Sequence, residues 1–374
     1  MRDRAPECMH ATTLLLTALT ALGYLAVLRL VDVNEKEPLW AIGMLFALGA
    51  GAAVVLRLVV PDTWLELEPV AGALGQELAR FLAVGAGVAA LGVVARYRGF
   101  SELNGLMDGV VYGGAAGLGA AVGGALLATF RNAPGELVSA IVAAPVASVG
   151  RAAVAGLAEG VFGALLGVGF AAAVHARRAP ARVAFVFVGF AAAALAHVGH
   201  ALFAFGDALG GDGARVRAWV ALALPVLCVA AVAVFALLGE KRAILSELAA
   251  EVELGVVGSD DVRILGSYWR REALYLGTLL RGRFAAAVRL RTLHNRVVQL
   301  ALAKRRAAAD PVAEDLAREV EGLRGAVVAL RQRLGVGAPD GPQPATLAAE
   351  APPAGEPPPE AAADAGAPGP EESH

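Results

Sequence analysis

The stretch Ala218–Leu238, AWVALALPVLCVAAVAVFALL, contains no charged residue. A helix of about twenty residues is ~30 Å long at ~1.5 Å per residue, which matches the hydrocarbon core of a bilayer. Similar runs recur throughout residues 11–238 and then stop. Backbone polar groups in lipid must be satisfied within the segment, so each run is expected to be a helix. The sequence therefore predicts an all-α, polytopic membrane protein.

The composition supports this class. Among 374 residues, 57% are hydrophobic and the mean hydropathy is +0.61, well above a soluble average. The 45 glycines suit close helix packing in lipid. Two cysteines cannot form a disulfide framework, and Cys228 is expected to be a small core residue of its apolar run. A soluble globular domain and a disulfide-rich secreted domain are both excluded.

Eight runs give about eight transmembrane helices. They are Ala11–Leu28, Leu39–Leu56, Phe81–Ala95 (with an alternative start near Val70), Leu106–Phe130, Leu137–Gly150, Ala152–Ala176, Val183–Phe205 and Ala218–Leu238. The fifth is short and contains Pro145. This leaves two alternatives to a full span, because the fifth run could be re-entrant or could merge with the sixth.

Lys and Arg residues flank the runs, and cytoplasmic loops carry an excess of them. They lie before the first run, between the sixth and seventh, and after the eighth: Arg2, Arg4, Arg177, Arg178, Arg182, Lys241 and Arg242. With eight spans all of these face the cytoplasm, which predicts cytoplasmic N- and C-termini. Arg96 and Arg98 then fall on the outer face, against the rule.

The chain divides into four regions by composition. Residues 1–10 are an N-terminal cytoplasmic segment, and 11–239 form the transmembrane domain. Residues 240–336 form a helical cytoplasmic region with a basic middle, which is expected to touch the lipid bilayer and not nucleic acid. Residues 337–374 are a Pro/Ala/Glu-rich tail, predicted to be disordered.

Ionisable or polar side chains within the runs or at their ends are costly in lipid and are therefore candidates for function. They are Gln76, Glu77, Arg80, Asp108, Tyr112, Arg151, Glu159, His197 and His200. Arg151 and Glu159 lie two turns apart and are expected to form structural pairs with other spans. They are assigned no chemistry.

Two patterns among these residues have both a structural and a chemical interpretation. Glu77 and Arg80 share a helix face, so they form an internal ion pair, or the carboxylate activates water or binds a metal. His197 and His200 lie on adjacent turns. They are satisfied by polar neighbours, or they ligate a metal such as zinc with Glu77 as the third ligand.

Asp108–Gly119, DGVVYGGAAGLG, is the most ordered motif of the chain. Its Gly109, Gly113, Gly117 and Gly119 predict a close-packed helix interface. Asp108 is expected to cap this helix, and Tyr112 belongs to the same structural motif.

This motif resembles the DG-hydrophobic-YG-x-x-x-GLG segment of the PrsW family of bacterial intramembrane proteases. QELAR at 76–80 stands where that family has Glu-Glu-x-x-Lys, and HALF at 200–203 resembles its His-Ala-Leu-aromatic-Asn motif. The stretch from Glu240 to about Arg306, with ELAAEVELGVV, resembles the tail of actinobacterial members. The likeness covers roughly residues 40–306.

The resemblance implies a bacterial plasma membrane protein that hydrolyses a peptide bond of a membrane-anchored protein, typically a single-pass anti-sigma factor. It implies a divalent metal such as zinc. Catalytic positions carried over are Gln76, Glu77 and Arg80, and the metal positions are His200, His197 and Glu77. Glu77 would act as base or ligand, with Arg80 orienting it.

The chain departs from the family pattern at most catalytic positions. Gln76 and Arg80 replace Glu and Lys, and Gly124 and Ala125 stand where the family has a Glu-Asn pair. Ala204 replaces the late Asn, and no His occurs between His10 and His175. Three functions follow: a peptidase with a reduced site, a pseudoprotease that binds transmembrane helices or scaffolds a signalling complex, and a small-molecule or lipid transporter.

Helix direction limits the site. If the fifth and sixth runs both span, the third and seventh helices are parallel, and Glu77 and His200 differ in depth by roughly 10 Å or more. A common site needs the third helix to begin well before Gln76, or the fifth run not to span.

Overall fold

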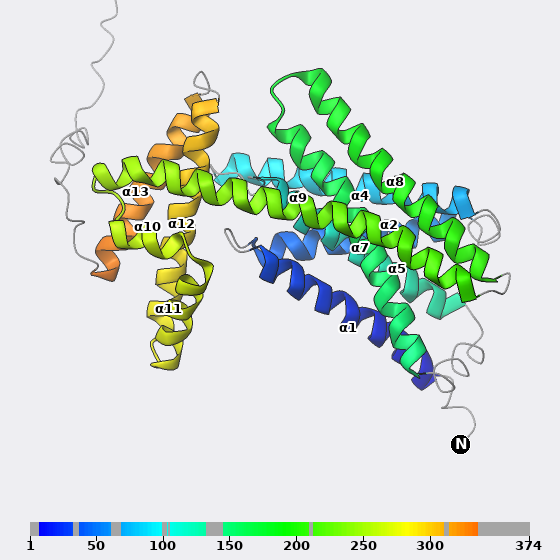
Figure 1. Ribbon diagram of the computed structural model, residues 1–374. Coiled ribbons are helices and arrows are strands. Elements are labelled where there is room, and N and C mark those ends of the chain that lie inside the picture. The colour runs from blue at the N-terminus through cyan, green and yellow to red at the C-terminus, as the bar shows by residue number, and fades with distance from the viewer. Residues whose placement is uncertain are drawn as a thin grey trace, which may run out of the picture.

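The protein is described here by a computed structural model. It describes residues 7–32, 37–60, 69–98, 103, 105–131, 145–208, 212–309 and 314–335. All regular structure in these ranges is helical (Figure 1). The N-terminal segment up to residue 6 and the predicted disordered tail 337–374 lie outside the described residues.

Within the described ranges, seven helices are long and apolar enough to cross a membrane. They are α1 (Glu7–Val31), α2 (Leu39–Val59), α4 (Pro69–Arg98), α5 (Leu106–Arg131), α7 (Pro145–His175), α8 (Ala179–Ala208) and α9 (Asp212–Glu253). This confirms a polytopic helical membrane protein.

The fifth predicted run is not a separate span. Its last part, Pro145–Gly150, is the start of α7, and its first part lies outside the described residues. Gly109 of α5 packs against Gly167 of α7, whereas Gly117 packs against Glu159. The two helices therefore run in opposite directions as consecutive spans, so the fifth run merges with the sixth.

An odd number of spans places the two ends of the transmembrane domain on opposite sides. Figure 1 shows the start of α1 at one end of the bundle and the last helices, α10 to α13, at the other. The prediction that both termini face the cytoplasm depended on an eighth span, which the described ranges do not contain.

The glycine motif forms the centre of the bundle, as predicted. Helix α5 lies between α2 and α7, and its glycines touch their backbones directly. A Cβ at Gly119 would overlap the carbonyl oxygen of Phe46, and one at Gly113 would overlap that of Gly163. Because these positions have no side chains, the helix backbones approach closely. The resulting van der Waals contacts stabilise helix association in lipid, where no hydrophobic driving force acts between helices.

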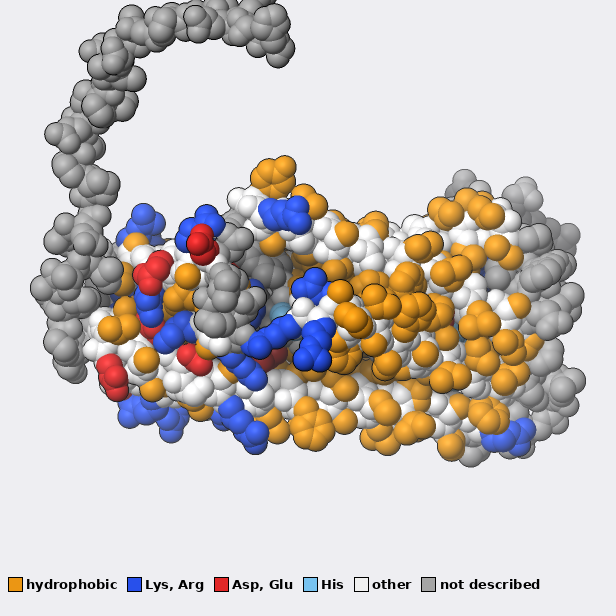
Figure 2. Space-filling view, turned by 90° about the horizontal axis from the view of Figure 1, so that it is seen from above, with side chains coloured by type: hydrophobic (Ala, Val, Ile, Leu, Met, Phe, Trp, Pro, Cys, Tyr) orange, Lys and Arg blue, Asp and Glu red, His pale blue; other side chains and the backbone are white. Residues whose placement is uncertain are grey.

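The outer surface of the seven helices is apolar, as expected for contact with lipid (Figure 2). Leu195 and Phe235 are among the large side chains exposed on it. Cys228 is also exposed there, so the prediction of a core cysteine was wrong. Helix α9 packs against its neighbours through its other faces. An apolar sequence alone does not show which side of the helix faces lipid.

Helix α9 continues from the apolar Ala218–Leu238 stretch to Glu253 and so enters the C-terminal helical region without a break. The helices that follow are α10 (Ser259–Leu265), α11 (Tyr268–Leu280), α12 (Phe284–Ala309) and α13 (Glu314–Leu334). Helices α10, α12 and α13 share a second hydrophobic core, to which α9 contributes Leu248. The region is thus anchored on a rigid extension of the last span.

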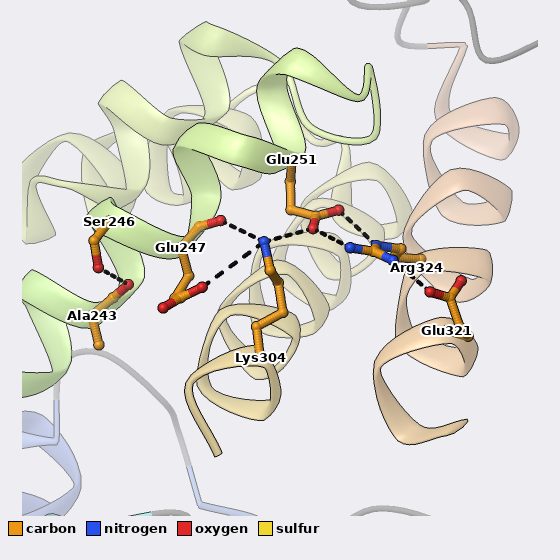
Figure 3. A network of polar contacts seen from close by, with 7 residues as sticks. All are labelled: Ala243, Ser246, Glu247, Glu251, Lys304, Glu321 and Arg324. Atoms are coloured by element: carbon orange, nitrogen blue, oxygen red, sulfur yellow. Dashed lines mark hydrogen bonds and ion pairs between the residues drawn. The ribbon is translucent and has the colours of Figure 1, made fainter. Parts of the chain in front are cut away.

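A buried carboxylate fastens this extension to the later helices (Figure 3). Glu251 of α9 is fully buried, and Nζ of Lys304 on α12 lies 2.8 Å from its Oε1. Arg324 of α13 donates to both carboxylate oxygens, at 2.7 and 3.0 Å. Two cations on a buried carboxylate compensate for its lost hydration, so the contact fixes three helices relative to one another.

Candidate functional site

Helix direction brings the predicted site residues together. Helix α4 begins at Pro69, well before Gln76, and it runs antiparallel to α8. Phe81 of α4 packs edge-on against Phe190 of α8, and one turn earlier Glu77 meets His197 later in α8. The condition that the sequence left open is therefore met, because the fifth run adds no span.

Four ionisable side chains from three helices form one buried network. Arg80 donates from Nη1 to Oε1 of Glu77 and from Nη2 to Oε2 of Glu159 on α7. Nδ1 of His197 lies 2.7 Å from the same oxygen of Glu77. Glu77 and Arg80 are 0% and 1% exposed, so lipid and bulk water are both kept away from them.

The formal charges of this network do not cancel, because pairing the guanidinium with one carboxylate leaves the other carboxylate in excess. Two carboxylates face one guanidinium, and an imidazole hydrogen-bonds one carboxylate. An unpaired buried carboxylate costs several kcal/mol, whereas one held by a guanidinium and a further hydrogen bond is compensated. Glu77 and Arg80 therefore form the predicted ion pair. Glu159 and His197, which are distant in the chain, extend it.

Glu159 is the residue whose role the sequence understated. It was expected to pair with another span and given no part in the site, yet it is the second carboxylate bound by Arg80. The helical spacing of Glu159 could not reveal this, because its partner comes from a helix 79 residues earlier. The side chain of Arg151 lies outside the described part of the chain.

The second histidine lies beside the network. His197 stacks on Phe162 with ring centroids 4.8 Å apart and an interplanar angle of 18°. His200, one turn later, is partly exposed and contacts the same ring at 6.1 Å. Phe162 thus orients both imidazoles from the α7 side.

A cavity of about 260 Å³ opens beside the network. Arg80, Glu159 and the predicted catalytic position Gln76 form part of its wall. The opposite wall includes Gly124 and Ala125, where the resembled family has its Glu-Asn pair. Small residues in place of that pair leave open space at this wall.

A separate polar cluster lies at the other end of α5. Oδ2 of Asp108 accepts a hydrogen bond of 2.9 Å from the backbone N–H of Gly105, so Asp108 caps the helix start as predicted. Tyr112 donates to the buried carboxylate of Glu37. The sequence did not single out Glu37, because it precedes the second run; its position directly before Pro38 at a helix start was the available signal.

Comparison with known proteins assigns the membrane-spanning part of the chain to a family. The model of a family described as PrsW family intramembrane metalloprotease matches residues 37–238, more than half of the chain. The chain belongs to this family. No curated protein and no solved structure matches it.

The family description implies a metal, and the residues described here do not fit a three-ligand site. Among the described side chains, no group of three His, Cys, Asp or Glu residues converges closely enough to hold an ion. The Oε1 atom of Glu77 is already bonded to both Arg80 and His197. Of the predicted ligands Glu77, His197 and His200, the first two are in contact with each other. The guanidinium of Arg80 lies beside them and binds Glu77.

Proposed function

We propose that this chain is a degenerate PrsW family member that binds a membrane-spanning helix of a partner protein without cleaving it. One observation carries the proposal: the guanidinium of Arg80 is bound between Glu77 and Glu159. A carboxylate held by a guanidinium is a poor base, because the cation stabilises its ionised form. Both carboxylates nearest the cavity thus serve as ion-pair partners.

The cavity supports binding in place of catalysis. Its wall is formed largely by Ala and Gly from α2, α5 and α7, and small residues let a transmembrane helix approach closely. Gln76 and Arg80 supply hydrogen-bond donors at one side, which favour a polar side chain or a carbonyl of the bound segment. The proposed partner is a single-pass membrane protein, such as an anti-sigma factor.

Reconstitution of the purified chain with a single-pass reporter tests the proposal. We expect no cleavage by wild type or by Glu77→Gln, and much less than one zinc ion per chain. A photo-reactive residue at cavity position Ala121 should crosslink the reporter helix, whereas one at lipid-facing Leu195 should not. Cleavage by wild type that Glu77→Gln abolishes, or stoichiometric zinc lost in that variant, would overturn the proposal.

A peptidase with a reduced site is the second candidate, and one observation favours it. Oε2 of Glu77 is buried and has no hydrogen-bond partner among the described residues. An oxygen in that state is available to accept a proton or to bind a ligand. The same reporter experiment separates the two functions.

We infer that the C-terminal helical region faces the cytoplasm and that the start of α1 faces outward. With seven spans, Arg96 and Arg98 at the end of α4 lie on the same side as Arg177, Arg178 and Lys241. These clusters then share the cytoplasmic side, as the positive-inside rule favours, whereas Arg2 and Arg4 before α1 fall on the outer side. An N-terminal epitope tag should be removed by protease added to spheroplasts, and a C-terminal tag should be protected; the reverse pattern would contradict this orientation.

A further inference from the structure

A second and larger cavity lies where the transmembrane helices meet the C-terminal helical region. Its volume is about 720 Å³. Its wall combines the turn between α7 and α8, the end of the apolar part of α9, the start of α5 and the last turns of α12. Figure 2 shows Lys and Arg side chains gathered around a hollow at this junction.

The polar wall of this cavity is strongly basic. Among the described lining residues, the four guanidinium groups of Arg177, Arg182, Arg305 and Arg306 outnumber one carboxylate, that of Glu240. Helix α12 brings two of these arginines to the cavity, the α7–α8 turn brings Arg177, and the start of α8 brings Arg182. Arginines from segments far apart in the chain thus converge on one space.

Within the described residues, the hydrogen bonds of Arg182 and Arg305 go to carbonyl oxygens and not to carboxylates. Arg182 donates from Nε to the carbonyl oxygen of Ala176 at 2.8 Å, and Arg305 donates from Nη1 to that of Gly239 at 3.2 Å. Carbonyl oxygens orient a guanidinium without neutralising it. Arg306 has one carboxylate partner, Glu319 at 2.9 Å, and its Nε has no hydrogen-bond partner among the described residues. Each guanidinium has five N–H donors, so several remain for a ligand.

The remaining wall is apolar and lies at the level of the membrane surface. Leu106, Val174 and Phe235 line the cavity on the transmembrane side. Helix α7 ends at His175 and the apolar run of α9 ends at Leu238, so this level corresponds to the head-group zone. A ligand here meets arginines at one end and hydrocarbon-like side chains at the other.

We propose that this cavity binds the phosphate-bearing head group of an anionic membrane lipid. Arginine forks match phosphate oxygens in charge and geometry, and basic pockets at the cytoplasmic surface select anionic lipids. The acyl chains lie along the apolar wall. A bound lipid joins α12 to the α7–α8 turn and so couples the C-terminal region to the bilayer. The proposal is independent of whether the chain cleaves its partner.

Native mass spectrometry of the full chain, released from nanodiscs of equal phosphatidic acid and phosphatidylcholine, tests this proposal. We expect retention of one phosphatidic acid, reduced at least tenfold by Arg182→Gln/Arg305→Gln. The matched control Arg270→Gln/Arg281→Gln removes two exposed arginines of α11 and its end, and it should retain the lipid. Equal retention by the cavity variant, or equal retention of phosphatidylcholine, would overturn the proposal.

A second measurement does not depend on the folding of the variant. Hydrogen exchange of the wild-type chain should slow in segments 174–182 and 302–306 when phosphatidic acid replaces phosphatidylcholine in the nanodisc. A parallel sample with inorganic phosphate added to phosphatidylcholine nanodiscs tests whether free phosphate protects the same segments. Equal protection by inorganic phosphate would overturn a lipid site in favour of a phosphate site, and unchanged exchange with phosphatidic acid would overturn both.

Discussion

Nδ1 of His197 lies 2.7 Å from Oε1 of Glu77, although the two residues are 120 positions apart in the chain. The contact joins α4 to α8, and Arg80 extends it to α7 through Glu159. Three helices of the bundle are thus held by one buried polar network. The same network occupies the carboxylate on which peptide hydrolysis by this chain would depend.

Replacing Arg80 tests the role of the network in stability. Arg80→Met leaves Glu77 and Glu159 without their cation, and breaking a buried pair in this way costs about 3–5 kcal/mol. We expect a matching loss of unfolding free energy in detergent, measured by steric trapping. Arg96→Met, which removes an exposed arginine from the same helix, should change it by less than about 0.5 kcal/mol. Stability retained by Arg80→Met would contradict the network's role.

The close approach of α5 and α7 is tested at one glycine. Gly163→Leu places side-chain atoms onto the backbone of Gly113 and Gly117, and we expect about 3 kcal/mol or more of destabilisation, because neither backbone can move aside. Gly92→Leu is the control, since a Cβ there meets nothing within 4 Å. Thermal unfolding of both variants in one detergent measures the difference. Similar midpoints would show that the two helices separate more easily than this packing indicates.

Glu251 provides a matched pair of changes in the C-terminal region. Arg324→Gln removes one of two cations from a fully buried carboxylate and should destabilise α13 by about 2–4 kcal/mol. Glu321 is another partner of Arg324, and its own side chain is 59% exposed. Glu321→Gln should therefore cost about 0–1 kcal/mol. Hydrogen exchange of α13 amides reports both values. Equal effects would argue against Glu251 as the anchor.

Acidification should loosen α11 and α12. Burial lowers the pKa of His294 from 6.5 to about 4, so the folded chain keeps a neutral imidazole beside Tyr275, with 2.8 Å between Nδ1 and the hydroxyl oxygen. The unfolded chain binds the proton first, so this stability is complete above about pH 6.5 and decreases as the pH falls towards 4.

Between pH 7 and 5 the expected loss is about 2 kcal/mol. It should appear as faster hydrogen exchange of α12 amides. In His294→Asn the pH dependence over this interval should nearly disappear, because no titrating group remains at that position. The same slope in the variant would assign the effect to other residues.

The sequence determined those features that depend on local composition. Lengths of apolar runs gave the membrane class, because a span must match the thickness of the hydrocarbon core. The glycine spacing of Asp108–Gly119 predicted the close-packed centre, since helical periodicity fixes which residues share a face. The same motif carried the family resemblance that the comparison bears out over residues 37–238.

Only the tertiary structure decided how these helices face one another. The sequence left open whether the fifth run spans, and that one choice reverses the direction of α8 relative to α4. The same choice decides whether Glu77 and His197 lie at different depths or in contact, as they do in the structure. Hydropathy records how apolar a segment is and not which neighbour covers each side. The partner of Glu159 and the lipid-facing position of Cys228 therefore depended on packing between helices distant in the chain.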